Sequence, residues 1–163
     1  MNRKSTTLNQ IRACSPCESG WTKLLKYLGK TTADDEPLPF SVILESNGLD
    51  DALWCCRASP EYDREWRLFA VWCARQVQHL MTDQRSIDAL DVAERFANGN
   101  ATEAELDAAR YAARYAARAA AGDAAWYAAG DAAGDAAWDA ARDAQKEVFL
   151  WIVSGGLAEW EVM

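Results

Sequence analysis

The chain has 163 residues, 50% of them hydrophobic, and a formal net charge of −8. This hydrophobic share excludes an intrinsically disordered protein, and no apolar run reaches the roughly 18 residues that a membrane span needs. The acidic balance argues against nucleic-acid binding, because phosphate contacts need clustered Lys and Arg. The first residues are polar and lead to no apolar stretch, so we expect no signal peptide and a cytoplasmic protein.

Residues 1–100 are predicted to form several short helices, because apolar side chains recur there at helical spacing between Gly and Pro signals. Gly29 and Gly48 each follow an apolar helical pattern and are expected to end a helix. The longest amphipathic segment spans 61–81, and a further helix is expected over about 86–97.

The same part of the chain contains no run that alternates with period two for long enough to be predicted as a strand. Residues 40–44 are the only ambiguous run, and we assign them to a short helix. In the helix that follows, Leu49, Leu53 and Cys56 are expected to line the inner face.

From Asp107 the chain reads in tetrads: DAAR, YAAR, YAAR, AAAG, DAAW, YAAG, DAAG, DAAW, DAAR, DAQK. Ala is the best helix former, so these tetrads predict one long helix or a hairpin of two helices. Thr102 and Glu105 have the T-x-x-E spacing of a capping box at its start. Three glycines mark where such a helix can break: Gly122, Gly130 and Gly134.

The tetrads carry two ladders of like charge. The basic ladder is Arg110, Arg114 and Arg118, and the acidic ladder is Asp131, Asp135, Asp139 and Asp143. Like charges four residues apart are mildly destabilising within one helix. We predict that the ladders face each other, within one chain or between two chains as a homo-oligomer. The alternative is that both are solvated faces.

The fold class expected from these patterns is all-α. We expect a single helical domain over 1–163, with a short-helix bundle over 1–100, the Ala-rich segment over 101–153 and a tail over 154–163. The run 148–153 is apolar enough to be buried.

Little in the sequence points to catalysis or to a metal. Cys14 and Cys17 form a lone C-x-x-C, whereas a zinc site needs four ligands. His79 is the single histidine, and no phosphate loop or nucleophile motif is present. We therefore expect a non-enzymatic protein with reduced cysteines, no metal and no cofactor.

The densest acidic feature before the tetrads is a group of six carboxylates: Asp34, Asp35, Glu36, Glu45, Asp50 and Asp51. Their spacing is not that of an EF-hand. Helix capping and solvated loop charge is one interpretation, recognition of a partner is a second, and binding of a divalent cation or acid–base chemistry is a third.

The block from Leu24 to Arg57, LLKYLGKTTADDEPLPFSVILESNGLDDALWCCR, resembles the Imm-5-like immunity proteins of bacteria and phages. The Ala-rich tetrads that close on DAQKEVF are similar to the same family, so the resemblance covers roughly residues 10–153. It implies an inhibitor that binds and neutralises a toxin protein.

Two functions of different class follow. The first is an immunity-type or phage anti-defence protein that binds and blocks a protein partner, in which an acidic, Trp-rich surface suits a basic protein. Its expected contacts are Asp34, Asp35, Glu36, Asp50, Asp51, Asp131, Asp135, Asp139, Trp126 and Trp138.

The second function is sequestration of a nucleotide-like small molecule in a groove between helices. Its expected residues are Arg110, Arg114 and Arg118 for phosphate, with Tyr111 and Tyr115 for stacking. A pocket with converging Arg and aromatic side chains would favour this function, whereas a flat acidic patch with exposed aromatics would favour the first.

Overall fold

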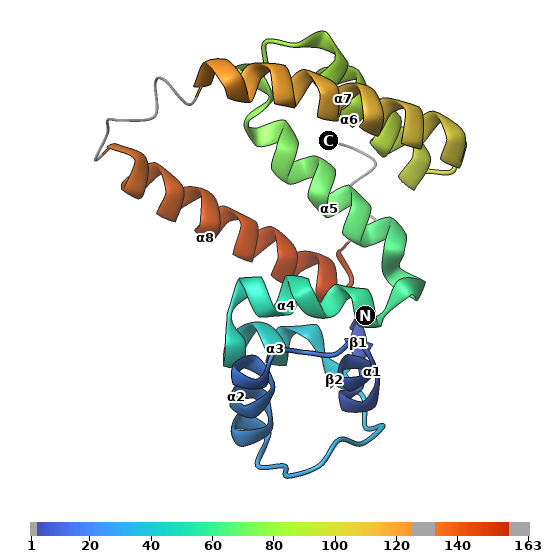
Figure 1. Cartoon of the computed structure of the whole chain (residues 1–163). Coiled ribbons are helices and arrows are strands. Elements are labelled where there is room, and N and C mark those ends of the chain that lie inside the picture. Colours follow the sequence, from blue (N-terminus) through green and yellow to red (C-terminus); the bar gives the residue numbers. More distant parts are fainter. Residues whose placement is uncertain (1–2, 125–132, 157–163) are drawn as a thin grey trace. The chain divides into compact units, whose positions relative to one another are not determined.

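The computed structural model describes residues 3–124 and 133–156, with side chains up to Arg114 and from Asp139 onward. The described chain is all-α, as predicted, with one two-stranded sheet (Figure 1). The elements are β1 (Ser5–Thr6), α1 (Leu8–Ala13), α2 (Glu18–Leu28), β2 (Leu38–Pro39), α3 (Phe40–Asn47), α4 (Leu49–Cys55), η1 (Cys56–Ala58), η2 (Pro60–Tyr62), α5 (Asp63–Gln76), η3 (Gln78–Leu80), α6 (Gln84–Ala97), α7 (Glu103–Ala124) and α8 (Ala133–Val153).

The chain divides into two compact units. Unit 1 comprises Met1–Asp63 with Lys146–Met163, and unit 2 comprises Arg64–Gln145. The segments expected within a single domain, 1–100, 101–153 and 154–163, do not coincide with these units, and the single domain stays a prediction. Helices α6 and α7 pack side by side (Figure 1), and this packing joins the residues before position 100 to those after it. Helix α8 contributes its first part to unit 2 and its last part to unit 1.

The predicted helix ends in unit 1 are confirmed at two glycines. Gly29 follows α2 with φ 65°, and Gly48 follows α3 with φ 93°, backbone conformations that favour glycine. The expected inner face of α4 is wrong by part of a turn. Ala52 and Cys55 are buried with Leu49, whereas Leu53 and Cys56 are only half-buried.

The short sheet in unit 1 was not expected from the sequence. β1 pairs with β2 in antiparallel register, with Ser5 opposite Pro39 and Thr6 opposite Leu38. A strand of two residues is too short to show an alternating pattern, so periodicity cannot reveal it. Because β2 immediately precedes α3, this pairing holds Ser5 and Thr6 beside the start of α3.

The core of unit 1 brings α3 against the last part of α8. Phe40 and Phe149 are both 0% exposed, with ring centroids 6.4 Å apart and planes at 85°. This edge-to-face arrangement is one that aromatic pairs prefer. The backbone N–H of Lys4 donates to the carbonyl oxygen of Val153 at 2.8 Å. The expected burial of 148–153 is confirmed at Phe149, Ile152 and Val153.

Helix α5 is shorter than the predicted segment 61–81. It ends at Gln76, and Val77 and Leu80, which the helical pattern placed on the apolar face, are exposed. The predicted helix over 86–97 is confirmed as α6, and Gly99 follows it with φ 74°.

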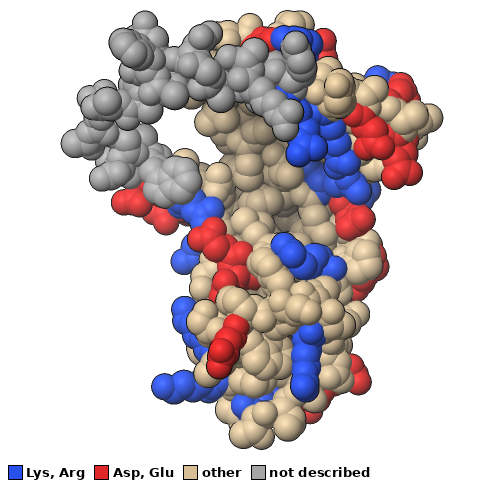
Figure 2. Space-filling view, viewed as in Figure 1, with Lys and Arg blue, Asp and Glu red and all other residues tan. Residues whose placement is uncertain are grey.

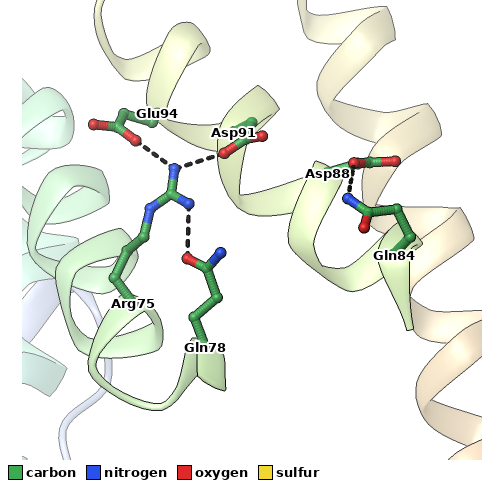
Figure 3. A network of polar contacts seen from close by, with 6 residues as sticks. All are labelled: Arg75, Gln78, Gln84, Asp88, Asp91 and Glu94. Atoms are coloured by element: carbon green, nitrogen blue, oxygen red, sulfur yellow. Dashed lines mark hydrogen bonds and ion pairs between the residues drawn. The ribbon is translucent and has the colours of Figure 1, made fainter. Parts of the chain in front are cut away.

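Arg75 at the end of α5 holds this helix against α6 (Figure 3). Its Nη2 donates at 2.7 Å to both Asp91 Oδ1 and Glu94 Oε2 on α6, and its Nη1 donates at 2.8 Å to Gln78 Oε1. One guanidinium can serve three acceptors because its donors have a fixed fork geometry.

The start of α7 confirms the predicted capping box. The backbone N–H of Glu105 donates to Thr102 Oγ1 at 3.2 Å, and the N–H of Thr102 donates to Glu105 Oε2 at 2.7 Å. The backbone N–H of Thr102, with its hydroxyl, holds the pKa of Glu105 below its ordinary value. Because the folded pKa is lowered, this contribution to stability is present above the unfolded pKa and is lost as the pH falls.

Replacing Thr102 by Ala is expected to lower the free energy of unfolding by about 1 kcal/mol, because a helix N-terminal donor loses its acceptor. Urea denaturation followed by circular dichroism measures this change. The matched control is Thr102→Ser, which keeps the hydroxyl. Equal losses in the two variants would contradict the role assigned to the capping hydroxyl.

The tetrad segment is described as α7 and α8. Gly122 lies inside α7 and Gly134 lies inside α8, so neither glycine ends its helix. Gly130 lies outside the described residues. Unfavourable single glycines are tolerated here because the surrounding alanines have the highest helix propensity.

Candidate functional site

A cavity of about 180 Å³ opens between α1, α2, α3 and α4 of unit 1, and we call it the unit 1 socket. Its walls are mainly apolar: Ile11 comes from α1, Leu24 from α2 and Ile43 from α3. Two tryptophans, Trp21 of α2 and Trp54 of α4, also line it. Cavities of this composition with a few placed polar groups are typical binding sites.

The polar part of the unit 1 socket is built by Asn47 and Asp51, one helical turn apart in sequence. Asn47 Nδ2 donates at 2.7 Å to Asp51 Oδ2 and at 2.9 Å to the carbonyl oxygen of Gly20. The amide of Asn47 therefore links α2 to α4 and fixes the position of the Asp51 carboxylate.

Gly20 allows α2 to approach this carboxylate closely. A Cβ atom at position 20 would lie 2.9 Å from Asp51 Oδ2 and 3.1 Å from Cys17 Sγ. The first distance is below any real Cβ contact, so one of the two groups would have to move. Glycine at position 20 therefore allows α2 to lie close to Asp51 in the wall of the socket.

The cysteines around the socket differ in exposure. Cys17 is exposed and Cys55 is buried, and both line the cavity. Burial, with the nearby charge of Asp51, raises the pKa of Cys55 to about 12, and burial also raises the pKa of Cys56 to about 12. Neither thiol is ionised near neutral pH, so neither supplies a nucleophile. Among the described residues no three His, Cys, Asp or Glu side chains gather as a metal site.

In the acidic loop before α3, Lys30 forms ion pairs with two of the carboxylates. Lys30 Nζ lies 2.5 Å from Asp34 Oδ2 and 2.6 Å from Glu36 Oε2. The hydrogen bond from Lys30 lowers the pKa of the Asp34 carboxyl. Asp35 and Asp50 are exposed. Among Asp34, Asp35, Glu36, Asp50 and Asp51, it is Asp51 that lines the unit 1 socket.

A second cavity of about 180 Å³ lies in unit 2, between α5, α6 and α7, and we call it the unit 2 groove. Arg67 and Arg110 are on its lining, and small residues, Ala70, Ala89 and Ala93, leave the space between the helices. The guanidinium of Arg67 lies 5.0 Å from the ring centroid of Phe96.

The two charge ladders form no ion pair with each other among the residues whose side chains are described. Arg110 instead lies 3.7 Å from Asp107 within α7, and Arg114, Asp139 and Asp143 are exposed. For these four ladder residues the predicted pairing within one chain is not observed. The remaining ladder residues, Arg118, Asp131 and Asp135, lie outside the described side chains.

The structure describes only one of the aromatic side chains that were predicted as contacts. Tyr111 is 76% exposed and is not on the lining of the unit 2 groove. The side chains of Tyr115, Trp126 and Trp138 lie outside the description. On the face shown in Figure 2, acidic and basic side chains lie among uncharged residues, and the described part of that face carries no broad acidic area.

Asp51 was predicted as a contact from the sequence, whereas most other residues of the unit 1 socket were not. Asn47 and Asp51 have the i, i+4 spacing at which side chains meet along a helix. That spacing spans the break between α3 and α4 at Gly48, so it gave no usable signal. Gly20 and Arg67 were missed because their roles depend on a neighbouring helix that is distant in sequence.

No helix in the described ranges is both long and apolar enough to cross a bilayer. Comparisons with protein-family models, curated proteins and solved structures found no match to this chain.

Proposed function

We propose that this protein is a non-enzymatic, immunity-type or phage anti-defence protein that binds and blocks a protein partner, with the unit 1 socket as a principal contact. The observation that carries the proposal is the size of the socket. At about 180 Å³ it is smaller than the roughly 300 Å³ at which pockets for small molecules begin. It suits a single inserted side chain.

The composition of the socket supports the same function. Residues that dominate binding between proteins are often large side chains that fill a well-packed apolar pocket and exclude water. Trp21 and Trp54 supply large apolar surface, and Asp51 supplies one fixed charge. The net charge of −8 would speed the encounter with a basic partner. The resemblance to Imm-5-like immunity proteins supports the class of partner, a toxin or a host defence component.

The alternative, sequestration of a nucleotide-like ligand, is supported less well. Arg110 lines the unit 2 groove together with Arg67, so two guanidiniums do converge there. The groove is no larger than the socket, and no aromatic side chain is on its lining. A nucleotide would therefore find phosphate partners without space or stacking for its base.

Affinity capture from bacterial lysate with the full-length chain tests the proposal. Bound proteins and bound small molecules are both identified by mass spectrometry, with Asp51→Asn as the test variant and Asp50→Asn as its matched control. The same protein should be retained by the wild type and by the control, and about tenfold less of it by Asp51→Asn, because a charge-assisted contact is lost. A stoichiometric nucleotide without any retained protein would overturn the proposal.

A further inference from the structure

We infer that the unit 1 socket recognises a basic side chain, Arg or Lys, that projects from the protein partner. This inference rests on the proposed function and names the chemistry of its contact. Asp51 has unused hydrogen-bonding capacity. A carboxylate offers about four lone-pair positions. Asn47 is the one donor to Asp51 in the described part of the chain, and it reaches only Oδ2.

The charge of Asp51 is also unmatched within the described residues. No Lys, Arg or His among them forms an ion pair with it. The carboxylate is thus fixed, charged and short of donors.

The basic side chain nearest in sequence does not fill this role. Arg57 is engaged elsewhere, because its Nε donates to the carbonyl oxygen of Trp54 at 3.0 Å and its guanidinium lies 4.4 Å from a Trp54 ring centroid. This contact is a cation–π interaction, which Trp makes better than other aromatics, and it engages Arg57.

The apolar walls determine what kind of cation fits. Ca²⁺ and Mg²⁺ take six or more oxygen ligands, whereas the socket offers a single carboxylate, and no three His, Cys, Asp or Glu side chains gather as a metal site among the described residues. Arg and Lys carry three or four methylene groups below a charged head, and they bury this stem against apolar surface while the head stays paired. Ile11, Leu24 and Ile43 would contact the stem, and Asp51 would pair with the head.

The test uses small probes and two signals that the protein already contains. The probe for the cation is n-butylguanidinium, and n-butanol and butyrate serve as its neutral and anionic counterparts. Binding is followed by the indole N–H signals of Trp21 and Trp54 in NMR spectra of the full-length protein. The rate at which iodoacetamide alkylates Cys17 gives a second, independent measure of occupancy.

We expect n-butylguanidinium to shift both indole signals and to slow Cys17 alkylation, with an apparent affinity about tenfold higher than that of n-butanol. Butyrate should produce neither effect. Asp51→Asn should remove the preference for the cation over the alcohol, whereas Asp50→Asn should retain it.

Equal binding of the cation and the alcohol to the wild type, or no response to the cation, would overturn this inference without any use of a variant. Either result leaves the protein capture experiment unaffected. A partner captured through Asp51 in the absence of cation binding would mean that the socket is used for a different side chain. If the wild type binds n-butylguanidinium but captures no protein, the proposed function would be refuted instead.

Discussion

Replacing Phe149 by Ala is expected to lower the free energy of unfolding by about 3–5 kcal/mol. Phe149 is 0% exposed and packs edge-to-face on Phe40, so the substitution removes a large buried side chain and leaves a cavity beside a second aromatic ring. The loss is large, because the whole free energy of unfolding of a folded domain is typically about 5–15 kcal/mol. This change in the free energy of unfolding is measured by urea denaturation, with hydrogen exchange of the unit 1 amides as the readout.

The control for this prediction is the neighbouring position on the same helix. Leu150 is 43% exposed, so Leu150→Ala should change the free energy of unfolding far less than Phe149→Ala. Similar losses for the two variants would show that α8 does not enter the core of unit 1 through Phe149.

Replacing Leu106 by Ala is expected to lower the free energy of unfolding of unit 2 by about 2–5 kcal/mol. Leu106 is 3% exposed on α7, and most other described side chains in the first half of that helix are Ala or exposed polar groups. Leu106 is therefore the main apolar contact in the part of α7 whose side chains are described, Glu103 to Arg114. The exchange rates of α6 and α7 amides report the loss, because these helices pack on each other.

The matched control, Tyr111, lies five residues after Leu106 on α7. Tyr111 is 76% exposed, and Tyr111→Ala should leave the exchange of α6 amides nearly unchanged. If Leu106→Ala left these rates unchanged as well, the packing of α7 on α6 would not depend on Leu106. The two variants therefore separate burial from a general effect of substitutions in α7.

Local patterns predicted most of the helices correctly, because each signal lies within a few residues of the feature it specifies. Gly29 and Gly48 adopt the positive φ that ends a helix, and Thr102 and Glu105 form their capping box within one turn. These interactions need no partner from elsewhere in the chain. They are therefore visible in a single sequence.

Features that depend on distant residues were not predicted. The strand pair β1–β2 joins residues more than 30 positions apart, and the unit boundary follows the packing of α6 on α7. The same reason explains why Asp51 could be singled out as an acidic residue but not placed in a cavity. Its surroundings come from α1, α2 and α3 as well as α4.

The pairing of Lys4 with Val153 has a consequence for the order in which the chain folds during synthesis. Unit 1 takes its first strand from one end of the described chain and its last buried helix turns from the other, with unit 2 between them. A ribosome releases the residues of unit 2 before those that complete the core around Phe40. Unit 1 can therefore complete its core only after all of unit 2 has been synthesised, when the backbone of Lys4 can pair with that of Val153.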